Sequence, residues 1–222
     1  MSLRPTISLY QDRGHVIQAG PATEPVTADE LRAQLVESVA GLPDTEANDL
    51  IAQAREMVEE ATGLALITQT WLLALDRWPS GQETWWDGMR QGAIADLTGP
   101  RRELQLPRYP LQSIGSVTVY DDAGNASVVT VANTFDVDTY RKPGRLTLKN
   151  GATWPVALRN SNAIEIVYVS GYGNAGDVPA ALKRAVKQAA AYLYTQRGDD
   201  CCDVDALGAV TGILALYKVA RL

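Results

Sequence analysis

The spacing of apolar residues changes twice along this chain of 222 residues, and the changes divide it into three regions. From about residue 26 to 62, apolar residues recur every three or four positions, as on the buried side of a helix. From about 67 to 170 they alternate with polar residues in short runs separated by turn residues, as in half-buried strands. The helical period then returns. Strands enclosed between helices predict an α+β fold with an antiparallel meander or small sandwich.

The same patterns give the boundaries of the expected elements. We expect helices over 27–39, 44–62 and 178–197 and a β insertion over about 67–170. A Pro- and Gly-rich arm, 1–25, precedes the main domain, 26–198, and a tail, 199–222, follows that domain. The arm is expected to be extended, with room for one short strand.

Local signals mark the ends of the first two helices. Thr27 and Glu30 form a T-x-x-E capping box, with apolar residues at the two staple positions around it. Gly63 is the expected C-terminal cap of the second helix. On that helix the charged positions lie off the apolar stripe, and we expect them to be exposed to solvent: Arg55, Glu56, Glu59 and Glu60.

Composition excludes several classes of function. A net charge of −6 argues against a surface that binds nucleic-acid phosphates without regard to sequence. No apolar run approaches the roughly 20 residues of a membrane span. The N-terminal segment lacks the apolar core of a signal peptide, so we expect an unexported protein in a reducing compartment. The adjacent Cys201 and Cys202 are then expected to be free thiols.

The motif G-x-G-x-x-G begins at Gly171, between a β-type run and a helix-like run, as in a dinucleotide-binding fingerprint. That fold needs a βαβ unit and two linked halves, and too few residues follow Gly176. Asp199 and Asp200 lie at the distance of the ribose-binding acid, but they follow a helix rather than a strand. We therefore interpret the glycines as a tight exit from the last strand, with Asp177 capping the next helix, and expect no cofactor.

Other residues with chemical potential are few. His15 is the only histidine, and without a G-x-S-x-G elbow we expect a surface residue rather than a triad member. Asp136 and Asp138 alternate on one predicted strand and share a face, with Asp121 and Asp122 near them in sequence. Such carboxylates suit a hard metal ion or acid–base catalysis, but acidic residues beside turns are common. We expect neither a catalytic nor a metal site.

Four of the five tryptophans fall into two groups, and Trp154 is the fifth. Trp71 and Trp78 lie in or beside apolar strands and are expected in the core, whereas Trp85 and Trp86 lie in a glycine-rich loop over about 79–100. A protein partner is the simplest target for the loop tryptophans, because buried tryptophan anchors dominate interface energetics.

Several stretches, in this order, resemble the head–tail connector proteins of long-tailed bacteriophages, also called adaptor or head-completion proteins, and their relatives in prophages and gene transfer agents. The likeness is carried by TGLALITQTW, LPRYPLQSIGSVTVY and VPAALKRA, and it covers about residues 27–197. The family fold is a small helical bundle with an inserted β region. This matches the prediction here of about three main helices with an antiparallel β meander or sandwich inserted between them and a C-terminal tail.

The resemblance implies structural work. Family members form a ring beneath the portal at the tail vertex of the capsid, extend the DNA channel and give the tail a docking surface. The implied partners are the portal protein, a tail-side neck or tail-terminator protein, and further copies of the chain in a homo-oligomeric ring of twelve. Some connectors are monomers until they meet the portal. DNA would pass through the channel without specific binding, and the chain would be made in the bacterial cytoplasm and lie at the head–tail junction of the virion.

Two other functions remain open: a small β-rich binding module that uses exposed tryptophans, and a metal-dependent enzyme that uses the aspartates. For the connector, subunit contacts are predicted at helix charges and loop tryptophans: Arg55, Glu59, Lys183, Lys187, Trp85 and Trp86. Portal contacts are predicted at apolar tail positions: Leu207, Val210, Ile213, Leu214, Leu216, Tyr217, Val219 and Leu222. The tail either is held away from the domain and orders on the portal, or packs on its own domain.

Overall fold

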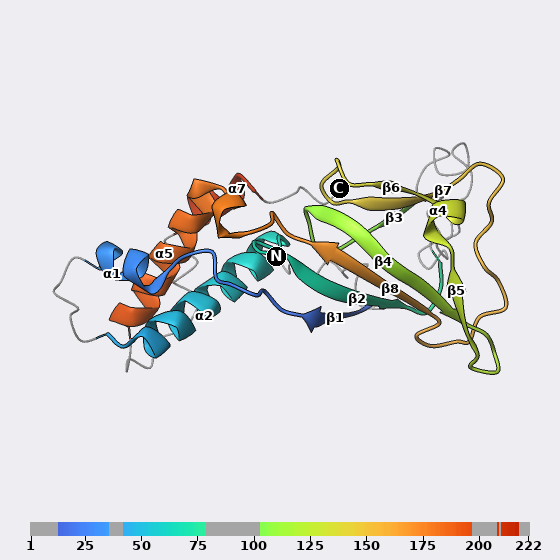
Figure 1. Ribbon diagram of the computed structural model, residues 1–222, viewed down its shortest axis with the longest axis horizontal. Coiled ribbons are helices and arrows are strands. Elements are labelled where there is room, and N and C mark those ends of the chain that lie inside the picture. Colours follow the sequence, from blue (N-terminus) through green and yellow to red (C-terminus); the bar gives the residue numbers. More distant parts are fainter. Residues whose placement is uncertain (1–12, 36–41, 79–102, 197–207, 209, 218–222) are drawn as a thin grey trace, which may run out of the picture. The chain divides into compact units, whose positions relative to one another are not determined.

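The computed structural model describes residues 13–35, 42–78, 103–196, 208 and 210–217 (Figure 1). The chain divides into two compact units. The β unit comprises Met1–Gln18, Thr70–Leu106 and Gln112–Val169. The helical unit comprises Ala19–Gln69, Pro107–Leu111 and Ser170–Leu222. The predicted α+β class, with antiparallel strands placed between helices in the sequence, is confirmed.

The helical unit contains four α-helices and a 3₁₀ turn among the described residues. They are α1 (Ala28–Gln34), α2 (Asp44–Thr62), η1 (Ala175–Asp177), α5 (Ala180–Thr195) and α7 (Thr211–Ala215). The capping box is present: Glu30 N–H donates to Thr27 Oγ1, and Thr27 N–H donates to Glu30 Oε2. The prediction that the first helix continues to residue 39 is wrong, because Leu35 already has extended dihedrals, with ψ 105°. Residues 36–41 lie outside the described part.

The second helix has the predicted bounds. Gly63 ends it in the left-handed conformation, with φ 77°, and its N–H donates to Glu59 O over 2.8 Å. The third predicted helix begins at Ala180, two residues later than expected. Pro179 precedes it at the N-cap position rather than in its first turn.

A single apolar core holds the helical unit together. The second and third predicted helices, α2 and α5, pack side by side (Figure 1). Their buried residues recur every three or four positions, as amphipathic helices require. On α2 they include Ala47, Ile51, Ala54 and Val58, and on α5 Leu182, Ala185, Val186, Ala189 and Ala190. Many are alanines, which allow the two helix backbones to approach closely.

The β unit is built on a five-stranded and a three-stranded sheet. The larger has the order β1 (Arg13–Ala19), β2 (Gln69–Leu75), β8 (Ile164–Ser170), β4 (Leu111–Tyr120), β5 (Ala126–Val129). The smaller has the order β3 (Glu103–Gln105), β7 (Arg145–Leu148), β6 (Phe135–Asp138), and the short helix α4 (Val131–Thr134) precedes β6. In β2 and β8, buried and half-buried residues alternate at every position, as the period of two predicts.

The predicted hairpin after Tyr120 is also present. Strands β4 and β5 pair antiparallel, with Tyr120 opposite Ala126, and Gly124 supplies a positive φ of 83° in the turn. The strand allowed for in the N-terminal arm is β1, which joins the sheet beside β2. Among the described residues, no helix is long and apolar enough to cross a lipid bilayer.

Candidate functional site

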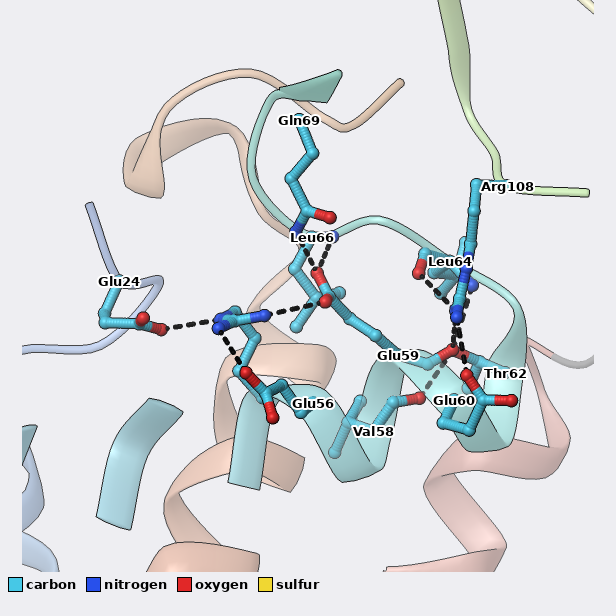
Figure 2. A network of polar contacts seen from close by, with 11 residues as sticks. Glu24, Glu56, Val58, Glu59, Glu60, Thr62, Leu64, Leu66, Gln69 and Arg108 are labelled. Carbon is cyan, nitrogen blue, oxygen red and sulfur yellow. Dashed lines mark hydrogen bonds and ion pairs between the residues drawn. The ribbon is translucent and has the colours of Figure 1, made fainter. Parts of the chain in front are cut away.

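The most elaborate polar arrangement in the helical unit surrounds Glu59, near the C-terminal end of α2 (Figure 2). Its side chain is 5% exposed. Oε1 accepts hydrogen bonds from Leu66 N–H at 2.7 Å and from Gln69 Nε2 at 2.8 Å, and Oε2 accepts one from Arg55 Nη1 at 2.9 Å. The carboxylate therefore fastens the loop after α2, and the start of β2, to the helix.

Burial dominates the electrostatics of this carboxylate. It raises the pKa of Glu59 above its ordinary value, although the Leu66 N–H and the Arg55 guanidinium act in the opposite direction. Arg55 is itself buried, which disfavours its charge, but Glu59 and Glu24 outweigh this effect and raise its pKa. Arg55 Nε donates to Glu24 Oε2 over 2.9 Å, and Glu56 lies 3.3 Å from its Nη2.

A second arginine closes the end of the same helix. Arg108 Nη1 donates to the backbone oxygen of Glu59 over 2.7 Å, and Nη2 contacts the Glu60 carboxylate at 2.5 Å (Figure 2). Tyr109 Oη donates to the backbone oxygen of Thr62 over 2.6 Å. The last carbonyls of a helix lack partners within the helix. Tyr109 supplies a donor to that of Thr62, and Arg108 adds a second donor to the Glu59 carbonyl, which already accepts from Gly63 N–H. The network around Glu59 and Arg108 thus ties the segment 107–111 to the end of α2 within the helical unit.

This network corrects one expectation. Arg55 and Glu59 were predicted on a solvated face, but both residues are only 4% exposed and have partners within their own chain. The reason is their spacing, because Ile51, Arg55 and Glu59 follow one another at intervals of four. Both charged residues continue the row that buried Ile51 begins. This spacing of four could have predicted that Arg55 and Glu59 are buried. Because both residues are charged, they were assigned to the solvent-exposed side instead. Because they are buried in their own chain, Arg55 and Glu59 are less accessible to a neighbouring subunit than exposed charges are.

The glycine motif serves the backbone. Gly171 and Gly173 have φ of 135° and 126°, which other residues rarely adopt. The N–H of Gly171 donates to Pro110 O, and Gly173 O accepts from Thr68 N–H. A Cβ at Gly171 would lie 2.3 Å from Ile67 O. The glycines therefore make the close strand-to-helix turn that the sequence indicated.

The predicted cap at Asp177 is only partly right. Its Oδ2 accepts from Asn174 N–H over 2.9 Å, within the 3₁₀ turn η1. It does not cap α5, which begins three residues later without a side-chain cap. The reason is that Pro179 intervenes, so the chain makes a separate short turn before the helix.

The aspartates of the β unit have structural partners. Asp138 Oδ2 accepts from Arg145 Nε over 3.0 Å, and its Oδ1 accepts from the N–H groups of Tyr140 and Arg141. Loss of hydration opposes ionisation, but these donors hold the pKa of Asp138 below its ordinary value. Asp136 is exposed and lies 3.9 Å from Lys149.

The second pair of aspartates belongs to the hairpin turn. Asp121 accepts from both the backbone and the side-chain nitrogens of Asn125, and the side-chain hydrogen bond is the larger cause of its lowered pKa. Asp122 is exposed. Within the described ranges, no group of three or more His, Cys, Asp and Glu residues could hold a metal ion.

His15 is not the surface residue that we expected. It stacks on Trp71, with ring centroids 4.5 Å apart, and its Nε2 lies 2.7 Å from Tyr168 Oη. It therefore joins β1 to β2 and β8. Trp71 and Trp78 are buried, as predicted, and Trp78 stacks on Trp154 at 4.4 Å.

The remaining contact candidates divide between surface and core. Lys183 and Lys187 lie half-exposed on α5. In the tail, Val210 and Leu214 are buried in the core of the helical unit, Ile213 and Tyr217 pack against it, and Leu216 is 81% exposed. Outside the described residues lie Trp85, Trp86, Leu207, Val219, Leu222, Cys201, Cys202, Asp199, Asp200 and the 79–100 loop.

These positions correct the hypothesis that the tail is held away from its domain. The segment 210–217 packs on the helical unit because its apolar residues recur at helical spacing and fit the core beside α2 and α5. Tyr109 Oη, whose proton goes to the closer Thr62 O, also lies 3.3 Å from Tyr217 O. Among the described tail residues predicted to contact a portal, Leu216 is the most exposed.

No family model matches the sequence, and no curated protein matches it. Solved structures do match. A chain from the neck of an empty gene transfer agent particle, computed with C6 symmetry, is 21% identical with a TM-score of 0.70, over 93% of this chain and 97% of that one. A chain from the virion of a native gene transfer agent particle is 20% identical with a TM-score of 0.70, over 94% and 96%.

A third match comes from the neck of a native gene transfer agent particle computed with C12 symmetry. It is 21% identical with a TM-score of 0.65, over 93% of this chain and 97% of that one. At these identities the likeness establishes the fold. The resemblance to head–tail connectors is thereby confirmed at the level of the fold, over nearly the whole chain rather than residues 27–197 alone.

Proposed function

We propose that this chain is a structural protein of a virion neck, where copies form a ring at the portal vertex, extend the DNA channel and join head to tail. One observation carries the proposal: its fold matches chains from gene transfer agent necks over 93% of its length at TM-scores of 0.65 and 0.70. The match spans most of both chains, 93% of this one and 97% of each neighbour.

The polar residues are consistent with structural work. Glu59 has donors on both carboxylate oxygens, Asp138 is held by Arg145 and backbone N–H groups, and the glycine motif uses its backbone groups for the turn itself. Asp138 and the glycine motif, which the sequence suggested for chemistry, thus have roles in holding the fold. These hydrogen-bond partners favour a non-enzymatic protein.

We propose twelve copies in the ring, with the portal protein on one side and a tail-side neck or tail-terminator protein on the other. The neighbours come from assemblies computed with C6 and C12 symmetry, and twelve copies fit both. The net charge of −6 suits a channel wall along which DNA slides without being held.

Deleting the gene in a particle-producing cell tests the proposal. We expect DNA-filled or empty heads without attached tails, and restoration of joined particles when the chain is supplied from a plasmid. The matched control is a plasmid that encodes Gly171→Asp, which disrupts the fold without removing the transcript. Normally joined particles from the deletion strain would refute a head–tail role.

A further inference from the structure

Helix α2 presents an acidic face to solvent. Asp49, Gln53, Glu56 and Glu60 follow one another at intervals of four, three and four residues and therefore share one side of the helix. All four are exposed, and the side chains of Glu56 and Glu60 are 71% and 81% accessible. The side opposite them carries the buried row that includes Ile51.

Helix α5 presents the opposite charge. Lys183, Arg184 and Lys187 are its only charged residues, and none of its residues is acidic. Arg184 is exposed and the two lysines are half-exposed. Within the part of the chain that the structure describes, none of the three has an ion-pair partner, and neither has Asp49.

The two faces do not pair with each other within one molecule, although Glu56 and Glu60 each have an arginine partner in their own chain, Arg55 and Arg108. Helices α2 and α5 turn their apolar rows toward a shared core, so the sides opposite those rows point away from each other. One copy therefore carries an acidic helix face and a basic helix face on different sides of the helical unit. Such an arrangement suits head-to-tail contacts, in which each copy uses one face toward each neighbour.

We propose that the acidic face of α2 in one copy docks on the basic face of α5 in the next copy around the ring. This inference rests on the proposed function, which supplies the ring. The occupant of each face is thus a second copy of this chain, recognised by charge complementarity. Duplex DNA is the competing occupant of the basic face, but three cations on a chain of net charge −6 are a small phosphate-binding surface.

Carbodiimide cross-linking of purified particles tests the contact directly, because this reagent joins carboxylates to lysines only where they touch. We expect a covalent dimer of the chain whose digest contains the α2 peptide with Asp49 or Glu56 linked to the α5 peptide with Lys183 or Lys187. Dimers linked only through other peptides would overturn the proposal.

Charge reversal gives a second test with an internal rescue. We expect D49K/E56K and R184E/K187E, each alone, to enter particles at least about tenfold less than the native chain, because like charges then face each other. Produced together, the two variants regain complementary faces and should enter particles in equal amounts. The chain that carries all four substitutions should also regain entry. The control is D122K, a reversal at an exposed position of the β unit, which should enter normally.

The outcomes separate this inference from the proposed function. If the native chain is absent from the neck, both fail. If the native chain and both reversed variants enter equally, the ring stands and this interface is overturned. Circular dichroism of each purified variant must show a native-like melting curve. If R184E/K187E is lost and the partner variant does not rescue it, while binding of the native chain to duplex DNA disappears in that variant, the basic face serves DNA and the proposal is wrong.

Discussion

The backbone N–H of Leu66 donates to Oε1 of Glu59 across 2.7 Å, and this contact joins the loop that leaves α2 to a carboxylate buried in the helix itself. The same carboxylate holds Arg55 and Gln69. Three donors from three positions therefore depend on one side chain for their partner. A buried donor left without an acceptor destabilises the folded state, because it has lost its hydrogen bonds to water and gained none in the protein.

Replacing Glu59 by alanine should destabilise the helical unit strongly. Removing one member of a buried ion pair costs about 3–5 kcal/mol. Arg55 keeps Glu24 as a partner, but the buried Leu66 N–H and Gln69 Nε2 lose the acceptor that Glu59 supplies. The measurement is urea unfolding followed by circular dichroism. Glu60→Ala is the matched control, since that side chain is 81% exposed and surface ion pairs contribute about 0–1 kcal/mol. Equal losses for the two variants would contradict the role given to Glu59.

The raised pKa of Glu59 predicts a dependence on pH with a definite sign. The folded state binds this proton more tightly than the unfolded state, whose carboxyl has the ordinary pKa of 4.5. Its contribution to the free energy of unfolding is therefore complete below pH 4.5 and falls as the pH rises through the folded pKa. The measurement is the difference in unfolding free energy between the native chain and Glu59→Gln across this range. A difference that grows with pH would show that the pKa is lowered instead.

Gly171 should tolerate no side chain. A Cβ there would lie 2.3 Å from Ile67 O, and φ of 135° is unfavourable for other residues. We expect Gly171→Ala to lower the unfolding free energy by more than about 2 kcal/mol, or to prevent folding. Gly176→Ala is the control from the same motif, because nothing lies within 4 Å of its added Cβ. If thermal melts show Gly176→Ala to be the more damaging change, the turn has been assigned wrongly.

The buried part of the tail makes a similar contrast. Leu214 is 3% exposed and Leu216 is 81% exposed, two positions apart. We expect Leu214→Ala to cost about 2–5 kcal/mol as a cavity in the core, and Leu216→Ala to cost about 0.5 kcal/mol or less. Truncation after residue 198 should likewise destabilise the helical unit. A truncated chain that melts at the native temperature would restore the hypothesis of a detached tail.

Local signals in the sequence were sufficient for the start of α1, the end of α2 and the alternation in two strands. The capping box at Thr27 acts within four residues, and Gly63 acts on the turn that it ends, so both are readable without the fold. Alternation in β2 and β8 reflects a pleat that any half-buried strand shares.

Contacts between distant segments could not be predicted in this way. Arg108 donates to the backbone oxygen of Glu59, which lies 49 positions earlier in the chain. The periodicity of apolar residues carries no information about such a contact. The burial of Glu59 was hidden for a different reason, since its carboxylate is tolerated in the core only because Leu66, Gln69 and Arg55 supply donors. His15 was misassigned likewise, because its partner Tyr168 lies 153 residues away.

Imaging the neck of particles that contain this chain is the most direct test of the proposed ring. We expect density for twelve copies of the chain, closed into a ring around the DNA channel between portal and tail, with the two sheets and the α2–α5 pair visible in each copy. Isolated single copies, or density for the chain elsewhere in the particle, would contradict the account.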